Sequence, residues 1–157
     1  FLPIYYTEAS LILAQADSMG LETKFFGCDG MDGILGVENF DTSLAEGLML
    51  LTPFAADSTD EKTQAFVTAY KDAYTDTPNQ FAADSYDAVY AIKAAAEKEN
   101  VTPDMDVADI CAALEKGMTE ITYDGLTGSA MSWAADGTVN KAPKAMEIKN
   151  GEYSLIQ

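Results

Sequence analysis

The stretch FLPIYYTEASLILAQADSMGLETKFFGCDG, residues 1–30, holds two apolar runs separated by a helical pattern. The first run, residues 1–6, predicts a strand buried on both faces, as strands of parallel sheets are. Thr7 can cap the helix that follows, and Gly20 predicts its end. Residues 24–27 predict a second strand. Strand, helix and strand in this order predict a βαβ layer of an α/β protein.

The helical pattern between the two runs predicts which side of the helix is buried. One face carries five residues, four of them apolar: Leu11, Ile12, Gln15, Ala16 and Met19. We therefore expect this face to pack against the sheet.

The predicted secondary structure changes from strands to helices at Pro53. Before it, residues 48–52 predict a third strand, which the proline ends. After it, the pattern predicts three helices, at about 60–74, at about 81–98 and in the residues that follow Pro103.

Three pairs of turn residues also punctuate the second half of the chain: Asp124-Gly125, Asp136-Gly137 and Asn150-Gly151. Such pairs between strand-like runs predict β-hairpins. The last two pairs fit a meander with strands at 128–134, 142–149 and 152–156.

The composition is that of a globular protein, with 48% hydrophobic and 22% charged residues among 157. The 26 acidic and 9 basic residues give a net charge of -17, which repels phosphate backbones and anionic membranes. We therefore expect no nucleic acid partner and no peripheral membrane binding. No apolar stretch reaches the roughly 18 residues that a membrane span needs.

The chain contains no histidine, so it lacks the commonest general base and the commonest metal ligand. Cys28 and Cys111 lie far apart in the sequence, and we expect both to be small buried side chains, with a disulfide between them left open. The Asp29–Asp32 pair lacks the spacing of a calcium loop. We therefore expect no catalytic residue, no metal site and no cofactor.

Aromatic and acidic side chains gather where the first two predicted strands end. In open α/β sheets, ligands bind beyond the carboxyl ends of the strands. The residues at these two ends are Tyr5, Tyr6, Thr7 and Glu8 after the first strand, and Asp29 and Gly30 after the second. The Asp29 carboxylate beside the Tyr5 ring suits a cationic group such as an ammonium ion. The residues alone also allow Asp29 to cap a turn and Tyr5 to be a core residue.

An ordered series of short motifs resembles the leucine/isoleucine/valine-binding protein family of ABC transporters. The series begins with EASLILAQADSMGL at 8–21 and FFGCDG at 25–30. It continues with Ala45-Glu46-Gly47, Thr52-Pro53, Phe66-Val67, Tyr70-Lys71, SYDAV at 85–89 and YDGLTG at 123–128. Each motif is short, but the ordered series extends over nearly the whole chain.

The resemblance implies a type I periplasmic-binding-protein-like α/β fold, in which two parallel-sheet lobes flanked by helices are joined by hinge strands. By this mapping, residues 1–53 form part of the C-terminal lobe, 54–140 belong mainly to the N-terminal lobe, and 141–157 return to the C-terminal lobe. A full-length member is more than twice as long, and Phe1 opens directly on a strand-like run. We therefore expect an incomplete two-lobed architecture.

The resemblance also implies a binding function without enzymatic activity. It implies that Asp29 pairs with the α-ammonium group of an amino acid, branched-chain or related, and that Tyr5 contacts the same ligand. The family's α-carboxylate site has no match in the chain, so we expect the chain alone to bind amino acids weakly or not at all. The implied partners are the amino acid and the permease of an ABC importer.

The location that the resemblance implies is extracytoplasmic. The protein would lie in the periplasm, or at a Gram-positive cell surface through a lipoprotein anchor that the chain lacks. Two alternatives stay open: a ligand-sensing domain of the same fold in a receptor, and an α/β enzyme. The enzyme is disfavoured because the chain has no histidine, no glycine-rich phosphate loop and no G-x-S-x-G motif.

Overall fold

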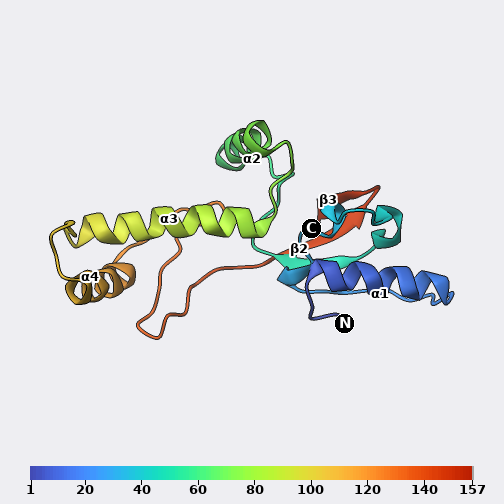
Figure 1. The fold of residues 1–157 in the computed structure, drawn as a ribbon, viewed down its shortest axis with the longest axis horizontal. Helices are drawn as coiled ribbons and strands as arrows, with labels where there is room; N and C mark the ends of the chain where they lie inside the picture. Colours follow the sequence, from blue (N-terminus) through green and yellow to red (C-terminus); the bar gives the residue numbers. More distant parts are fainter. Residues whose placement is uncertain (157) are drawn as a thin grey trace. The chain divides into compact units, whose positions relative to one another are not determined.

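The computed structural model describes residues 1–156 and divides into two compact units. The first unit comprises Phe1–Gln80 and the chain from Pro143 onward, and the second comprises Phe81–Ala142. Figure 1 labels the helices of both units and two of the strands of the first. The division into lobes that the resemblance implies stays a prediction.

The first unit begins with helix α1 (Tyr6–Ser18) and three short 3-10 turns. These turns are η1 (Asp29–Met31), η2 (Ile34–Gly36) and η3 (Thr42–Ala45). Helix α2 (Glu61–Tyr74) follows later and confirms the helix expected at about 60–74. It begins there because the Asp60 carboxylate accepts a hydrogen bond from the backbone N–H of Thr63 at 2.9 Å.

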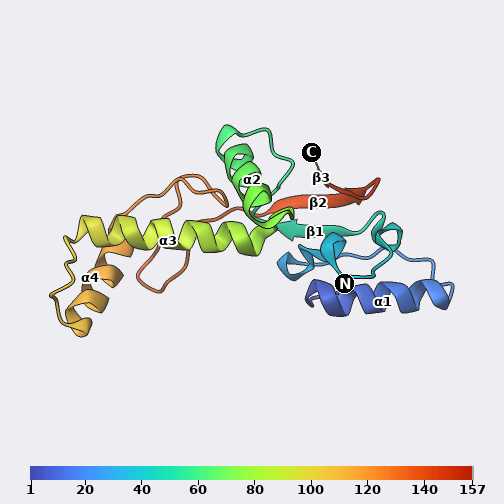
Figure 2. The ribbon, with the colours of Figure 1, turned by 45° about the horizontal axis from the view of Figure 1, so that its top comes forward.

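The sheet of the first unit has three strands in the order β1 (Met49–Thr52), β2 (Lys144–Lys149) and β3 (Glu152–Leu155), all antiparallel. Figure 2 shows the long β2 beside β1. Between β2 and β3, Asn150 and Gly151 have φ values of 53° and 74°. Both values are positive, as a type I′ turn requires, so the hairpin predicted at this pair is confirmed.

The sheet that forms is antiparallel, and the parallel sheet expected from residues 1–6, 24–27 and 48–52 does not develop. Parallel pairing is confined to two isolated bridges, which join Leu2 to Gly27 and Phe26 to Met49. Neither grows into a ladder, because the turn η1 starts only two residues after Gly27 and the backbone N–H of Met31 donates to the carbonyl oxygen of Cys28 at 3.1 Å. The first two predicted strands therefore exist as single bridged positions.

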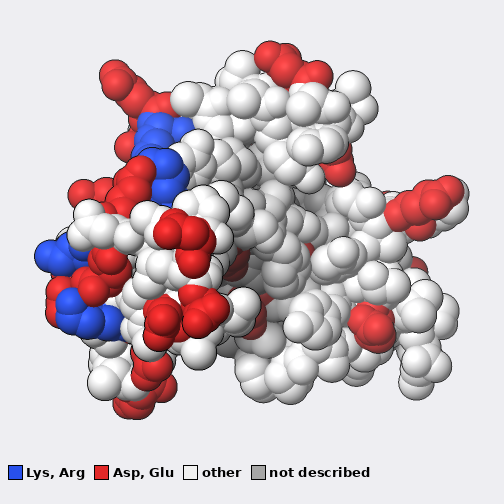
Figure 3. Space-filling view, turned by 60° about the vertical axis from the view of Figure 1, so that its left-hand side comes forward, with Lys and Arg blue, Asp and Glu red and all other residues white. Residues whose placement is uncertain are grey.

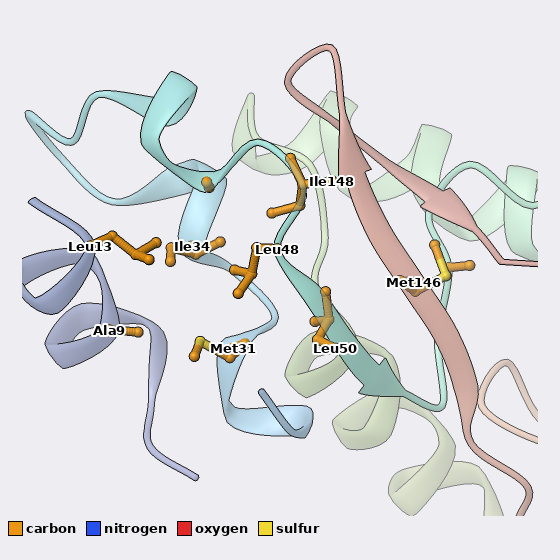
Figure 4. Close-up of a cluster of buried hydrophobic side chains, with 10 residues drawn as sticks. Ala9, Leu13, Met31, Ile34, Leu48, Leu50, Met146 and Ile148 are labelled. Carbon is orange, nitrogen blue, oxygen red and sulfur yellow. The ribbon is translucent and has the colours of Figure 1, made fainter. Parts of the chain in front are cut away.

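The core of the first unit lies between α1, the 3-10 turns and the sheet. Figure 4 shows Leu13 of α1 and Leu48 on either side of Ile34. The buried residues of the cluster are Ala9, Leu13, Met31, Ile34, Ala45, Leu48, Leu50, Ala55, Met146 and Ile148. The turns thus contribute core side chains, which anchors the loop that carries Asp29.

Helix α1 buries a different face from the one expected. Its buried residues are Ala9, Ser10, Leu13 and Ala16, whereas Leu11 is 69% exposed and Met19 is 73% exposed. The run Leu-Ile-Leu-Ala places apolar side chains around most of the helix, so periodicity alone leaves its rotation undetermined.

The N-terminus of α1 also differs from expectation. Tyr5 occupies the N-cap position, without a side-chain cap, and Thr7 is the second residue of the helix. The carbonyl oxygen of Thr7 accepts a hydrogen bond from the Ser10 hydroxyl at 2.7 Å. The predicted cap at Thr7 is therefore wrong.

The second unit contains most of helix α3 (Gln80–Lys98) and all of α4 (Val107–Glu120). Both helices confirm the sequence-based expectation. They approach closely at Gly117, where a Cβ atom would lie 2.7 Å from the carbonyl oxygen of Ala95. The strand expected at 128–134 is reduced to isolated antiparallel bridges, at Tyr123–Met131 and at Trp133–Val139.

Cys111 is exposed on α4 and Cys28 is half-buried, and both are free thiols. The expectation that Cys111 is buried is therefore wrong. None of the helices formed by residues 1–156 is long and apolar enough to cross a lipid bilayer.

Lysines of the second unit lie among carboxylates. Lys93 pairs with Glu97 at 2.7 Å and Lys116 with Glu99 at 2.7 Å. The face drawn in Figure 3 shows basic side chains interleaved with acidic ones. Its lysines therefore form no continuous positive patch.

Candidate functional site

The chain segments that end at Tyr5 and at Asp29 lie side by side within the first unit. The N–H of Leu2 donates to the carbonyl oxygen of Phe26 at 2.8 Å, as part of the parallel bridge between Leu2 and Gly27. Parallel segments have their carboxyl ends at the same edge, so residues 5 and 29 emerge on one side.

Gly30 brings the two ends into direct contact. A Cβ atom at Gly30 would lie 2.8 Å from the carbonyl oxygen of Ile4 and 3.4 Å from the Cα atom of Tyr5. The first distance is shorter than real Cβ contacts allow, so only glycine fits without a shift of the backbone. The turn at Asp29–Gly30 is therefore packed on the Ile4–Tyr5 backbone.

The side chains at this junction differ in exposure. Tyr5 is 63% exposed, and Asp29, Thr7 and Glu8 are also exposed, the last two in the first turn of α1. Tyr6 is half-buried and packs against the core cluster. The predicted site residues thus share one junction, but Tyr6 belongs mainly to its support.

Substituting Gly30 tests how closely the two segments must approach. Gly30→Ala is expected to destabilise the protein by about 1–3 kcal/mol, the usual cost of overpacking. Gly36 ends the η2 turn of the same loop with nothing within 4 Å of a Cβ position, so Gly36→Ala is the matched control.

Urea unfolding of the two alanine variants measures both effects. Gly36→Ala is expected to change the free energy of unfolding by less than about 0.5 kcal/mol. Equal stability of the two variants would show that the Ile4–Gly30 contact relaxes freely.

Two buried residues that sequence reasoning missed hold the Asp29 turn. Asp32 is 5% exposed and Gln80 is 1% exposed. The side-chain amide of Gln80 donates to the carbonyl oxygen of Asp29 at 2.5 Å, and its backbone N–H donates to Asp32 Oδ2 at 2.7 Å. The one local signal was an aspartate inside the apolar run Met31–Leu35; nothing in the sequence pointed to Gln80.

A hollow of about 500 Å³ adjoins this support. Its lining includes Tyr6, Asp32, Thr52, Lys71 and Tyr153. The backbone N–H of Gly33 donates to the Tyr153 hydroxyl at 3.0 Å. Burial, followed by the nearby Asp32 carboxylate, raises the pKa of Tyr153 to about 12. The phenol is therefore neutral at physiological pH and serves as an acceptor for the loop backbone.

No group of three or more His, Cys, Asp or Glu side chains among residues 1–156 is arranged to hold a metal ion. The exposed groups at the junction are the carboxylates of Asp29 and Glu8, the phenol ring of Tyr5 and the Thr7 side chain in the first turn of α1. Such a set can bind a small polar ligand through charge and ring contacts.

Comparison with known proteins places the chain in a family. A family model described as periplasmic binding protein matches residues 4–152. The chain belongs to the periplasmic binding protein family. Members of this family are binding proteins without enzymatic activity, typically extracytoplasmic, and the match identifies the chain as related to solute-binding proteins of ABC transporters. No curated protein matches the chain.

Several solved structures of the family share its fold. The branched-chain amino acid substrate-binding protein LivJ from Streptococcus pneumoniae, in complex with isoleucine, is 28% identical with a TM-score of 0.78, over 98% of this chain and 43% of that chain. The leucine-binding protein LivK from Thermotoga maritima is 22% identical with a TM-score of 0.79, over 99% and 42%.

A third structure widens the range of ligands. A solute-binding protein from R. palustris, in complex with benzoate, is 19% identical with a TM-score of 0.77, over 94% of this chain and 39% of that chain. The chain thus spans about 42% of the length of the T. maritima protein and similar shares of the other two. Its fold is part of a type I periplasmic-binding-protein-like architecture.

Proposed function

We propose that the chain is part of the solute-binding component of an ABC importer and that it captures an amino acid, branched-chain or related, by its ammonium group. Asp29 supplies the carboxylate that pairs with the ammonium group. Tyr5 supplies a ring and a hydroxyl beside it. Thr7 and Glu8 border the ligand from the first turn of α1, and Gly30 lets the turn approach Tyr5.

One observation carries this proposal: the Asp29–Gly30 turn packs on the Ile4–Tyr5 backbone while both side chains remain exposed. A carboxylate held on a rigid turn loses little conformational freedom when it binds a cation, which favours affinity. The isoleucine complex of the S. pneumoniae relative, whose fold the chain shares, supports the same ligand class.

The charge of the chain favours a zwitterion over an anion. A net charge of -17 opposes the approach of an anion such as benzoate, the ligand of the R. palustris relative. An amino acid carries no net charge and offers its ammonium group to Asp29. The effect of the net charge is limited by salt, which screens charges beyond about 8 Å at physiological ionic strength.

The proposed transport role follows from binding between two lobes. A ligand that contacts both lobes stabilises the closed state, which a permease can recognise. In the proposed arrangement, residues 1–53 and 141–157 lie in the C-terminal lobe and 54–140 mainly in the N-terminal lobe. The chain also divides into two compact units, but their boundary falls after Gln80 rather than after residue 53. The proposed location is extracytoplasmic.

The test is a thermal-shift and calorimetric comparison of matched ligands with the protein that carries this sequence. Leucine is expected to raise the melting temperature by binding the folded state. Its oxo analogue 4-methyl-2-oxopentanoate, which lacks the ammonium group, is expected to bind at least about 30-fold more weakly, since Asp29 then loses its partner. Equal affinity for the two compounds, or tighter binding of benzoate, would rule out recognition through the ammonium group.

A further inference from the structure

A buried polar cluster supports the Asp29 turn, and we call its members Asp32, Thr52 and Gln80 the support cluster. These residues are 5%, 2% and 1% exposed. Polar groups this deeply buried need hydrogen-bond partners, which restricts the positions they can take. The cluster therefore has a defined geometry that it can impose on its neighbours.

Gln80 bonds to the Asp29 turn at two points. Its side-chain Nε2 donates to the carbonyl oxygen of Asp29 at 2.5 Å, and its backbone N–H donates to Asp32 Oδ2 at 2.7 Å. The same carbonyl oxygen accepts the backbone N–H of Asp32 at 3.0 Å. The peptide group of Asp29 is thus held by its own turn and by a residue 51 positions away.

Thr52 completes the cluster from the end of β1. Its hydroxyl oxygen lies 3.4 Å from Gln80 Oε1 and 3.4 Å from Asp32 Oδ2. It also accepts the backbone N–H of Phe54 at 3.2 Å. Because a hydroxyl has one proton, it can donate to only one of these acceptors at a time. Gln80 is the member of the cluster whose side chain bonds to the Asp29 backbone.

We infer that Gln80 is a positioning residue for ligand binding: it holds the backbone of Asp29 so that the exposed carboxylate faces the ligand. This inference rests on the proposed function, since it assigns Gln80 an effect that acts through Asp29. Gln80 is also the first residue of α3 and the last residue of the first unit's N-terminal segment. A shift of the backbone at Gln80 therefore changes its bond to the Asp29 carbonyl oxygen and its bond to Asp32 Oδ2 together.

Gln80→Met tests the inference, because methionine has a similar length and cannot donate. Leucine affinity of the protein that carries this sequence is expected to fall about 3- to 10-fold, the range for one lost hydrogen bond. Gln64→Met is the matched control. Gln64 Nε2 also donates to a backbone carbonyl, that of Ser58 at 2.5 Å, but on the exposed start of α2. The control variant is expected to bind leucine within twofold of the unsubstituted protein.

A double-mutant cycle separates positioning from general support. Gln80→Met is combined with Asp29→Asn, which keeps the shape of the side chain and removes its charge, and leucine affinity is measured by NMR titration. A positioning role predicts that Gln80→Met causes little further loss in the Asp29→Asn background. The same loss in both backgrounds, or no loss in either, would overturn the inference. An unchanged affinity of Asp29→Asn alone would instead refute the proposed function.

A second measurement needs no substitution and covers the case in which Gln80→Met fails to fold. The side-chain amide protons of Gln80 are expected to exchange with solvent more slowly than those of Gln64, because the Gln80 amide is buried and bonded. They are also expected to shift when leucine is added. Exchange as fast as that of Gln64 would show that the bond to Asp29 does not persist, and the inference would fail.

Discussion

Asp29→Ala is expected to weaken leucine binding by about 30-fold to several thousand-fold, which corresponds to about 2–5 kcal/mol. The loss is large because the ammonium group of the ligand leaves water and then finds no carboxylate. The exposed position of Asp29 in the structure means that its side chain is available to a ligand. Isothermal calorimetry with leucine measures the change.

The control for this prediction is Asp72→Ala, which removes the same charge from an exposed position in the last turn of α2. Its leucine affinity is expected to stay within about twofold, since an exposed charge outside the proposed site is screened by salt. Asp29→Ala is also expected to bind leucine and 4-methyl-2-oxopentanoate with similar affinity. Unchanged leucine affinity in Asp29→Ala would remove this residue from the binding site.

Asp87→Ala is expected to destabilise the second unit by about 2–5 kcal/mol, because it leaves two buried N–H groups without acceptors. Asp87 lies on α3 and is 5% exposed. Its Oδ1 accepts the backbone N–H of Leu126 at 2.9 Å. Its Oδ2 accepts the backbone N–H of Thr127 at 2.9 Å and the Thr127 hydroxyl at 2.8 Å.

The turn around Gly125 is built on this carboxylate. A Cβ atom at Gly125 would lie 2.3 Å from Asp87 Oδ2, so no other residue fits there without movement. This turn lies between Tyr123 and Met131, which form an antiparallel bridge. Loss of Asp87 is therefore expected to loosen the segment that follows α4.

Asp84→Ala provides the comparison for Asp87→Ala. Asp84 lies about one turn earlier on α3 and pairs with Lys141 at 2.5 Å, with its side chain 39% exposed. Loss of this partly exposed ion pair is expected to cost no more than about 1 kcal/mol. Urea unfolding followed by the fluorescence of Trp133, which belongs to the same unit, measures both variants. Equal stability of the two would refute the role assigned to Asp87.

Local patterns in the sequence predicted local structure well. The helix expected at 81–98 is α3 (Gln80–Lys98), and the Asn150-Gly151 pair forms the expected hairpin. In both cases the signal lies within the element itself, as helical periodicity or as residues that tolerate positive φ.

Features that depend on tertiary packing were predicted poorly. The parallel sheet was expected from apolar runs, but these runs form only single bridges before α1 or η1 begins. The rotation of α1 was also wrong, because its apolar side chains surround the helix. Short apolar runs do not reveal how many partners a strand will find.

The residues of the candidate site also fall into a group that the sequence predicted and a group that it did not. The junction of Tyr5 with Asp29 and Gly30 could be predicted from the sequence, because parallel segments end at the same edge. The support from Asp32 and Gln80 could not, because their bond joins residues 48 positions apart and no local pattern encodes it. Whether the exposed side chains bind a ligand stays a prediction.

The tight fit of Gly30 against Ile4 has a consequence for redesign of specificity. An insertion in either segment would separate two backbones that now touch. Laboratory evolution toward new solutes should therefore succeed through exchanged side chains at positions 5 and 29, and fail through lengthened loops. A library for such an experiment should therefore vary positions 5 and 29 and keep glycine at position 30.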